Sequence, residues 1–284
     1  ADVSLEKLLT DSFNEYTKNF MLYFKNLLII FVIPSTILAF FFNLLISILQ
    51  LGTLFDPTKN IETGINLLLL FIMVIYMTIY MILSLLMSSS VFRIIKLKDL
   101  NRNITPKTLF YDAKRFVLPL MGKSFFVLFI YGLLSLLVVI PGLLFWKISG
   151  TFTFIHGLIL VFLFIILTIL YTVISVFWSL SNSAIIYDEK GVFNSLKLSR
   201  ILVKGNWWGT FGRILLLGLI GSALASALML PIWLMSMILS MIPVVGGAIQ
   251  TAIQSAVSIL VAPFGAIFIT KYYLGLKENK SIRK

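Results

Sequence analysis

The sequence predicts an all-α polytopic membrane protein, a bundle of six transmembrane helices with three amphipathic helices on the membrane surface. Its hydrophobic fraction of 60% and charged fraction of 12% differ clearly from the soluble averages of roughly 45–50% and 25%. Six runs carry no charged residue, and each has at least 23 residues, whereas about 20 suffice to cross a bilayer. These runs are residues 27–51, 65–92, 124–146, 158–186, 214–242 and 248–270.

The Lys and Arg residues lie almost entirely on one side of the predicted spans. Six spans place both termini on the same side of the membrane, and 21 of the 23 basic residues fall on that side. Lys59 and Lys147 fall on the other. Because cytoplasmic loops retain basic residues, this asymmetry predicts a multi-pass protein of the cell membrane with both termini in the cytoplasm.

Residues 5–24 predict a helix with one apolar and one polar face, ahead of the first run. At 3.6 residues per turn, one side carries Leu5, Leu8, Leu9, Ser12, Phe13, Tyr16, Phe20 and Tyr23. The other side carries Lys7, Asp11, Asn14, Glu15, Lys18 and Lys25. A helix of this kind, followed directly by a spanning run, is typical of a helix that lies along the membrane surface.

The second surface helix is predicted to begin at Thr105 and Pro106. Threonine is a favoured N-cap residue, and proline suits the first helical position. An apolar stripe follows at 4-3-4 spacing and consists of Leu109, Ala113, Phe116 and Leu120, opposite the basic residues Lys107, Lys114 and Arg115. We expect Pro119 to end or bend this helix.

The third surface helix is predicted after the polar segment 188–191. One stripe consists of Val192, Leu196, Ser199 and Val203, and another consists of Lys197, Arg200 and Lys204. Trp207 and Trp208 follow where an interfacial aromatic belt is expected.

A surface helix followed by two spans is a pattern that occurs three times within one integral membrane domain, residues 1–284. The repeats are approximately residues 1–100, 101–190 and 191–284. The first and third copies align without a gap, so that Ser12 matches Ser199 and Asn19 matches Asn206. Each repeat begins and ends on the same side of the membrane, which predicts parallel repeats related by a pseudo-threefold axis along the membrane normal.

Two segments carry a family resemblance: residues 12–20 (SFNEYTKNF), ahead of the run that contains Pro34, and residues 191–207, with GVFNSL at their start and KGNW at their end. They resemble the membrane domain of glycerophosphoryl diester phosphodiesterases and related stand-alone bacterial and archaeal membrane proteins. In those enzymes catalysis belongs to a separate soluble barrel rich in acidic and histidine residues, and the 284 residues contain no such segment. The resemblance implies a fold and a lipid context without the phosphodiesterase activity.

Ionisable residues are absent from the six runs, and the chain has no cysteine. A proton relay, a thiolate nucleophile and a metal site inside the bundle therefore have no candidate residues. The single histidine, His156, has no acidic neighbour in sequence and is assigned a structural role. We predict no catalytic residue, no cofactor and no enzyme activity.

Uncharged polar residues recur at helical spacing within the runs and form a candidate polar cavity. They are Asn43, Ser47, Thr168, Thr172, Ser175, Ser179, Asn182, Gln250, Gln254 and Ser258. An amide group in lipid costs several kcal/mol unless it is paired, so these stripes are expected either to face one polar space or to pair between helices. The second interpretation is favoured because hydroxyl residues commonly join membrane helices, at about 0.6 kcal/mol per contact.

Together these features predict a lipid-associated membrane module that binds or passes an amphiphile or a small solute. The alternative is a scaffold or accessory subunit that holds a partner at the cytoplasmic face. Basic side chains on the surface helices are expected to contact anionic lipid head groups. The candidate contacts are Lys107, Lys114, Arg115, Lys197, Arg200 and Lys204. No nucleic-acid partner is expected, because the basic residues behind the net charge of +12 flank the predicted spans. The sequence does not identify a protein partner or an oligomeric state.

Overall fold

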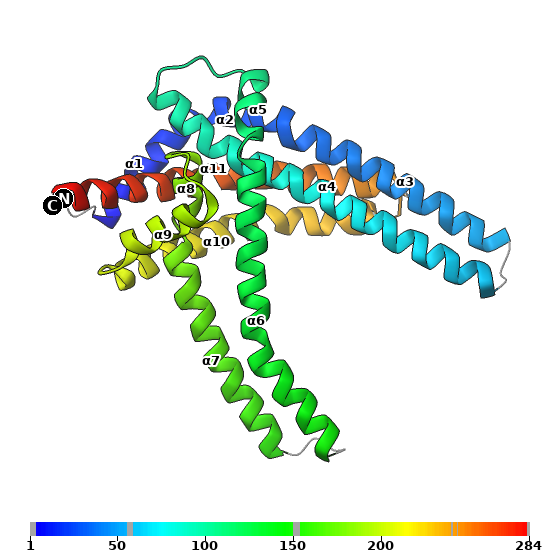
Figure 1. The fold of residues 1–284 in the computed structure, drawn as a ribbon. Helices are drawn as coiled ribbons and strands as arrows, with labels where there is room; N and C mark the ends of the chain where they lie inside the picture. The colour runs from blue at the N-terminus through cyan, green and yellow to red at the C-terminus, as the bar shows by residue number, and fades with distance from the viewer. Residues whose placement is uncertain (1–3, 56–58, 150–153, 240, 243, 283–284) are drawn as a thin grey trace. The chain divides into compact units, whose positions relative to one another are not determined.

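Helices occupy almost all of the chain in the computed structural model, which describes residues 4–55, 59–149, 154–239, 241–242 and 244–282. The described residues form eleven α-helices and one π-helix and contain no strand. Six helical segments are long and apolar enough to cross a membrane: Phe20–Leu49, Asn66–Asp99, Val117–Phe145, Phe154–Ile186, Trp207–Met237 and Val245–Lys280. The predicted all-α fold with six spans is therefore confirmed (Figure 1).

The chain divides into two compact units. Unit 1 comprises Ala1–Val117 and Leu215–Lys284, and unit 2 comprises Leu118–Ile214. The sequence predicts one membrane domain with three parallel repeats. The division into two units does not test the symmetry of these repeats, so the repeats stay a prediction.

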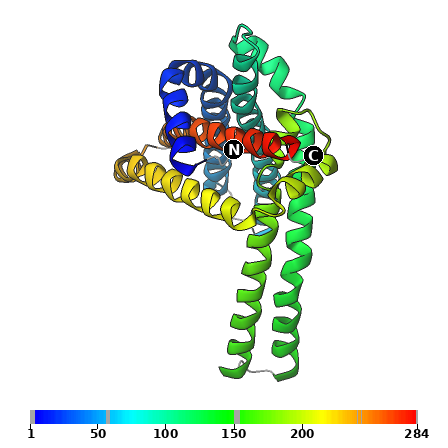
Figure 2. The same ribbon diagram turned by 90° about the vertical axis from the view of Figure 1, so that its left-hand side faces the viewer.

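Unit 1 packs the first and last helices of the chain against each other. Its elements are α1 (Leu5–Lys18), α2 (Phe20–Leu27), the π-helix η1 (Leu28–Val32), α3 (Ile33–Phe55), α4 (Lys59–Asp99), α5 (Pro106–Lys114), α11 (Val245–Ile282) and, from Leu215 on, α10 (Trp207–Leu239). Helix α11 contacts α1, α2, α3 and α4, and Figures 1 and 2 show α3 and α4 side by side. The core contains Leu27, Ile94, Leu109, Ile267 and Tyr273, all fully buried.

The first surface helix ends at Lys18, so the predicted end at Phe24 is wrong. The side-chain amide and the backbone N–H of Asn19 both donate to the Glu15 carbonyl, at 2.7 and 3.2 Å. An asparagine that bonds the preceding turn in this way competes with continuation of the helix. Helix α2 then begins at Phe20 and belongs to the first span.

The π-helix Leu28–Val32 ends two residues before Pro34, which is the second residue of α3. Proline has no N–H for the carbonyl four residues earlier, and its ring crowds that carbonyl. The widened turn accommodates this loss. The hydroxyls of Ser35 and Thr36 donate to the Val32 carbonyl at 3.0 and 2.7 Å, so that carbonyl has partners next to the break.

Unit 2 is built on a long hairpin. From Leu118 on it contains α6 (Val117–Ser149), α7 (Phe154–Trp178), α8 (Ser181–Ile186), α9 (Val192–Val203) and the start of α10. Helices α6 and α7 run side by side (Figures 1 and 2). The Tyr171 hydroxyl donates to the Tyr131 carbonyl at 2.7 Å and ties the two helices together.

The fourth span is interrupted near its end, whereas the sequence predicts one continuous run, residues 158–186. The Ser199 hydroxyl of α9 donates to the Phe177 carbonyl at 2.6 Å and accepts the Leu180 N–H at 3.2 Å. These bonds satisfy backbone groups at the break between α7 and α8. Of the stripe predicted for the third surface helix, Leu196, Ser199 and Val203 are buried and Val192 is half-buried.

Candidate functional site

The strongest candidate site lies in unit 1, where α5 packs on α4. Thr105 and Thr108 form a capping box: the Thr108 N–H donates to Thr105 Oγ1 at 3.2 Å, and the Thr105 N–H donates to Thr108 Oγ1 at 3.0 Å. The predicted N-cap and the position of Pro106 are therefore correct. Leu109 and Ala113 are fully buried, so the apolar side of α5 faces the protein and its basic side faces outward.

The predicted stripe continues beyond α5, through Phe116 and Leu120, which are also buried. The helix ends at Lys114, before Pro119, and Pro119 lies in the first turn of α6. An N–H group in the first turn of a helix has no intrahelical partner, so proline is tolerated there.

An ion pair between a buried arginine and a half-buried aspartate holds α5 in place. Arg93, in the last part of α4, is 3% exposed, and its Nε donates to Asp112 Oδ2 at 2.8 Å. Its Nη2 contacts the same oxygen. Asp112 Oδ1 also lies 3.4 Å from Arg115 Nη2, and both guanidinium groups lie over the Phe116 ring, with centroid distances of 5.2 and 4.8 Å. A buried arginine requires such a carboxylate, so Asp112 is a structural anchor.

Beside this anchor is a cavity of about 550 Å³, which we call the basic cavity. Its lining consists of Leu97, Arg102, Asn103, Lys107, Thr108, Tyr111, Asp112 and Arg115. Three lining residues are cations, and the one lining carboxylate is already bound by Arg93. Arg102 and Lys107 have no carboxylate partner within the part of the chain that the structure describes. The arrangement therefore presents excess positive charge in a hollow of ligand size.

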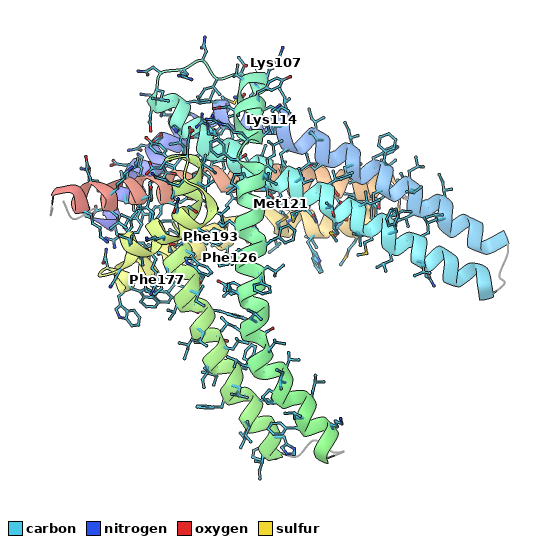
Figure 3. All side chains as sticks on the ribbon, in the orientation of Figure 1. Lys107, Lys114, Met121, Phe126, Phe177 and Phe193 are labelled. Atoms are coloured by element: carbon cyan, nitrogen blue, oxygen red, sulfur yellow. The ribbon has the colours of Figure 1, made fainter. Side chains whose placement is uncertain are left out.

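Three predicted head-group contacts lie on or directly after α5, and two of them, Lys107 and Arg115, line the basic cavity. The third, Lys114, is exposed outside it, and its Nζ lies over the Tyr111 ring, 4.4 Å from the centroid. Figure 3 labels Lys107 and Lys114 on this helix.

The other three predicted contacts, Lys197, Arg200 and Lys204, lie on or directly after α9 in unit 2 and are exposed. The Arg200 guanidinium lies 6.0 Å from the centroid of the Phe177 ring. In the same unit, the Phe126 and Phe193 rings contact each other edge to face (Figure 3). None of the three basic residues belongs to the basic cavity lining.

In unit 1 the predicted polar residues divide between two environments. The Asn43 amide donates to the Ala39 carbonyl at 2.8 Å and lies against Gly247, where an added Cβ would be 2.6 Å from Asn43 Nδ2. Ser47 and Gln250 are half-buried. Gln254 and Ser258 are exposed, and the Ser258 hydroxyl donates to the Gln254 carbonyl at 2.9 Å.

In unit 2 the predicted stripe hydrogen-bonds mainly within its own segment of chain. The hydroxyls of Thr168, Thr172, Ser175 and Ser179 donate to carbonyls three or four residues earlier, at 2.8–3.1 Å. Asn182 lies beyond the break, on α8, and its Oδ1 accepts a hydrogen bond from Lys123 Nζ at 2.6 Å. Because these residues lie in one unit and Asn43, Ser47, Gln250, Gln254 and Ser258 lie in the other, a shared cavity stays a prediction.

Glu15 makes contacts between helices that the sequence did not predict, because the pattern assigned Glu15 only to a polar face. Its carboxylate binds Lys98 Nζ at 3.2 Å and Lys271 Nζ at 2.9 Å, and Lys271 also donates to the Asp11 carbonyl at 2.9 Å. Burial acts to raise the pKa of Glu15, but hydrogen bonds and attraction from Lys271 and Lys98 outweigh it, so the pKa lies below its ordinary value. These contacts fasten α1 to the last turn of α4 and to α11.

Arg93 and Asp112 also escaped prediction. A signal for Arg93 was present, because it directly follows the uncharged run 65–92, and an ionisable residue at a membrane span usually pairs with another group. No comparable signal marks the partner of Arg93, since the two residues are brought together by packing of α5 on α4. Among the described residues, no group of three or more His, Asp or Glu side chains is placed to hold a metal ion.

Comparison with known proteins identifies a family without a known function. No curated protein and no solved structure matches the chain. No named relative therefore supports the resemblance to phosphodiesterase membrane domains. The family model described as "Domain of unknown function (DUF7847)" matches residues 31–276, which is most of the chain, and the protein therefore belongs to this family.

Proposed function

We propose that this protein is a non-enzymatic, lipid-binding module of the cell membrane, and that its basic cavity binds an anionic lipid head group. The observation that carries the proposal is the cavity of about 550 Å³ lined by Arg102, Lys107 and Arg115. The lipid context implied by the resemblance to phosphodiesterase membrane domains agrees with this proposal.

A phosphate group suits the charge and the chemistry of this cavity. Arginine presents a planar fork of N–H donors to phosphate oxygens, and lysine adds a mobile point charge. Asn103 and Thr108 add neutral polar groups to the lining. Loss of a direct hydrogen bond to a charged group costs about 1.5–3 kcal/mol, so we expect the pair Arg102 and Lys107 to contribute about 2 kcal/mol together.

The proposal places the basic cavity on the cytoplasmic side, where anionic head groups attract basic segments. The placement of 21 of 23 basic residues on one side of the spans supports this orientation. Single cysteines are clean probes because the chain has none. In intact cells an impermeant maleimide should label Lys59→Cys and leave Lys107→Cys unlabelled; the reverse pattern would invert the topology.

Lipid binding is tested with the full chain reconstituted in nanodiscs that contain trace fluorescent phosphatidylglycerol in phosphatidylcholine. The double variant Arg102→Ala/Lys107→Ala should weaken phosphatidylglycerol binding by about 10- to 30-fold, which corresponds to about 2 kcal/mol. The matched control Lys7→Ala/Lys18→Ala removes the same charge from exposed positions of α1 outside the cavity. The control should change binding less than twofold.

Other outcomes of this test decide between the remaining roles. Equal loss in both variants would mean that general surface charge attracts the lipid and that the cavity has no special role. No loss in either would reject the proposal in favour of the scaffold role, in which a partner occupies the cytoplasmic face. Passage of a solute needs the polar stripes to face one space, and loss of transport in Gln254→Leu with the fold intact would support that finer role.

A further inference from the structure

A second hollow in unit 1 is almost entirely apolar. We call it the apolar groove; its volume is about 450 Å³. Its lining consists of Phe13 and Tyr16 of α1, Ile220, Leu224 and Leu228 of α10, and Leu260, Val261 and Phe264 of α11. It shares no residue with the basic cavity.

Two walls of the groove belong to segments that span the membrane, Trp207–Met237 and Val245–Lys280. Along α11, Phe264 and Leu260 lie seven and eleven residues before Lys271, which corresponds to about 10 and 16 Å at 1.5 Å per residue. Lys271 directly follows the uncharged run 248–270, and a lysine at the end of such a run extends toward the head-group level. The groove therefore lies at the depth of the lipid hydrocarbon.

The third wall, α1, is fastened to α11 by polar contacts on either side of the groove residues. The Tyr16 hydroxyl donates to the Leu260 carbonyl at 2.7 Å. Lys271 Nζ donates to the Asp11 carbonyl at 2.9 Å and pairs with the Glu15 carboxylate. The amphipathic helix is thus held at a set distance from α11, and the groove is formed before any ligand enters.

The polar group that lines the groove is already in use. The Tyr16 hydroxyl is committed to Leu260, and burial raises the pKa of Tyr16, which keeps the hydroxyl protonated as a donor. A bound water needs two to four polar partners, and a polar ligand needs at least as many. The contents of the groove must therefore be hydrocarbon.

We infer that the apolar groove holds one acyl chain of a membrane lipid. The groove is continuous with the exposed apolar surface of α10, where Leu224 and Leu228 are 48% and 40% exposed, and in a bilayer the medium at that surface is lipid acyl chain. Its volume is about three times that of a ~150 Å³ cavity that holds one benzene ring, which leaves room for roughly 18 carbon atoms. An acyl chain in the groove occupies a site separate from the basic cavity. This inference therefore goes beyond the proposed binding of a head group.

The test uses the full chain in phosphatidylcholine vesicles with a trace of phosphatidylcholine that carries a diazirine in the middle of one acyl chain. After irradiation, lipid adducts are mapped by mass spectrometry. We expect adducts on the peptide that contains Val261 and Phe264, and at least a fivefold loss of them in Leu224→Trp, whose new side chain fills the groove. The matched control Leu219→Trp lies on the same helix, is exposed and does not line the groove; it should change the yield less than twofold.

Two results would overturn the inference. One is an unchanged adduct yield in both Leu224→Trp and Val261→Trp, with both variants still eluting as folded protein. The other is efficient disulfide dimerisation of Leu224→Cys in the membrane, which would show that a second copy of the chain covers the groove. Because the probe lipid is zwitterionic, Arg102→Ala/Lys107→Ala should leave the adducts unchanged, so failure of the groove and failure of the basic cavity are separable.

Discussion

Unit 1 joins its helices through polar side chains, whereas α7 of unit 2 returns most of its hydroxyls to its own backbone. In unit 1, Ser35 of α3 hydrogen-bonds Ser255 of α11 at 3.0 Å, and Arg93 of α4 binds Asp112 of α5. In unit 2, Thr168 and Thr172 donate to carbonyls four residues earlier. The same kinds of residue at the same helical spacing thus serve two different purposes.

The difference shows why a polar stripe in a membrane helix is a weak indicator of a cavity. A serine or threonine hydroxyl can always reach the carbonyl three or four residues earlier, so it is satisfied even when the helix faces lipid. It becomes a contact between helices only where another helix covers that face. Ser255 is fully buried, whereas Thr168 is exposed.

The largest effect is expected for Asp112→Ala. This change leaves the buried Arg93 guanidinium without its carboxylate, and breaking a buried ion pair in this way costs about 3–5 kcal/mol. The apparent melting temperature in detergent, followed by fluorescence-detected size exclusion, should fall strongly. Lys114→Ala, an exposed change on the same helix, is the control and should melt with the wild type. Wild-type melting of Asp112→Ala would show that the pair does not hold α5 on α4.

A smaller but clear loss is expected for Ser199→Ala, a change at a position where unit 2, like unit 1, uses a polar side chain to join two helices. The buried Leu180 N–H and Phe177 carbonyl lose their partner, and an unsatisfied buried group costs about 1–3 kcal/mol. The melting temperature is again the measurement, with Ser195→Ala as a control, since the Ser195 hydroxyl bonds its own helix. Equal effects of the two changes would argue against a special role for Ser199 at the break between α7 and α8.

The comparison between the units is tested directly by Ser255→Ala and Thr172→Val. Loss of the contact with Ser35 should cost about 0.6 kcal/mol, and at most about 1.7 kcal/mol. Thr172→Val should have no measurable effect, because the hydroxyl bonds only its own helix. Paired urea or heat titrations in the same detergent measure both changes. A larger loss for Thr172→Val would break the comparison and revive a polar site on α7.

The smallest effect is expected for protonation of Glu15. Because its pKa in the folded protein lies below its ordinary value, the ion pairs stabilise α1 docking at pH values above the unfolded pKa of about 4.3, and this stabilisation is lost as the pH falls through the folded pKa. A nitroxide at Thr17→Cys should have constant mobility as the pH falls from 7 toward the unfolded pKa, and its mobility should rise only as the pH falls further, through the lower folded pKa. In Glu15→Gln the mobility should be high already at pH 7 and should not change with acid.

The sequence was sufficient to predict the spans and much of the surface helices. Membrane crossing depends on the length and polarity of one segment at a time, so the six uncharged runs in the sequence found all six spanning helices. The capping box at Thr105 and the buried stripe of α5 are equally local, because a helix start and a helix face are set by residues within a few turns. The end of α1 was missed, since the bond from the Asn19 side chain to Glu15 has no distinctive spacing.

Tertiary structure decided which polar residues meet. Glu15 finds Lys98 and Lys271 across 83 and 256 positions of sequence, and Tyr16 finds the Leu260 carbonyl. The helix pattern placed Glu15 on a polar face and Tyr16 on an apolar face of the same helix. A pattern within one helix does not identify the residues of other helices that these side chains contact. Both the basic cavity and the apolar groove arise from the spacing between packed helices, and this spacing depends on side chains from several segments at once.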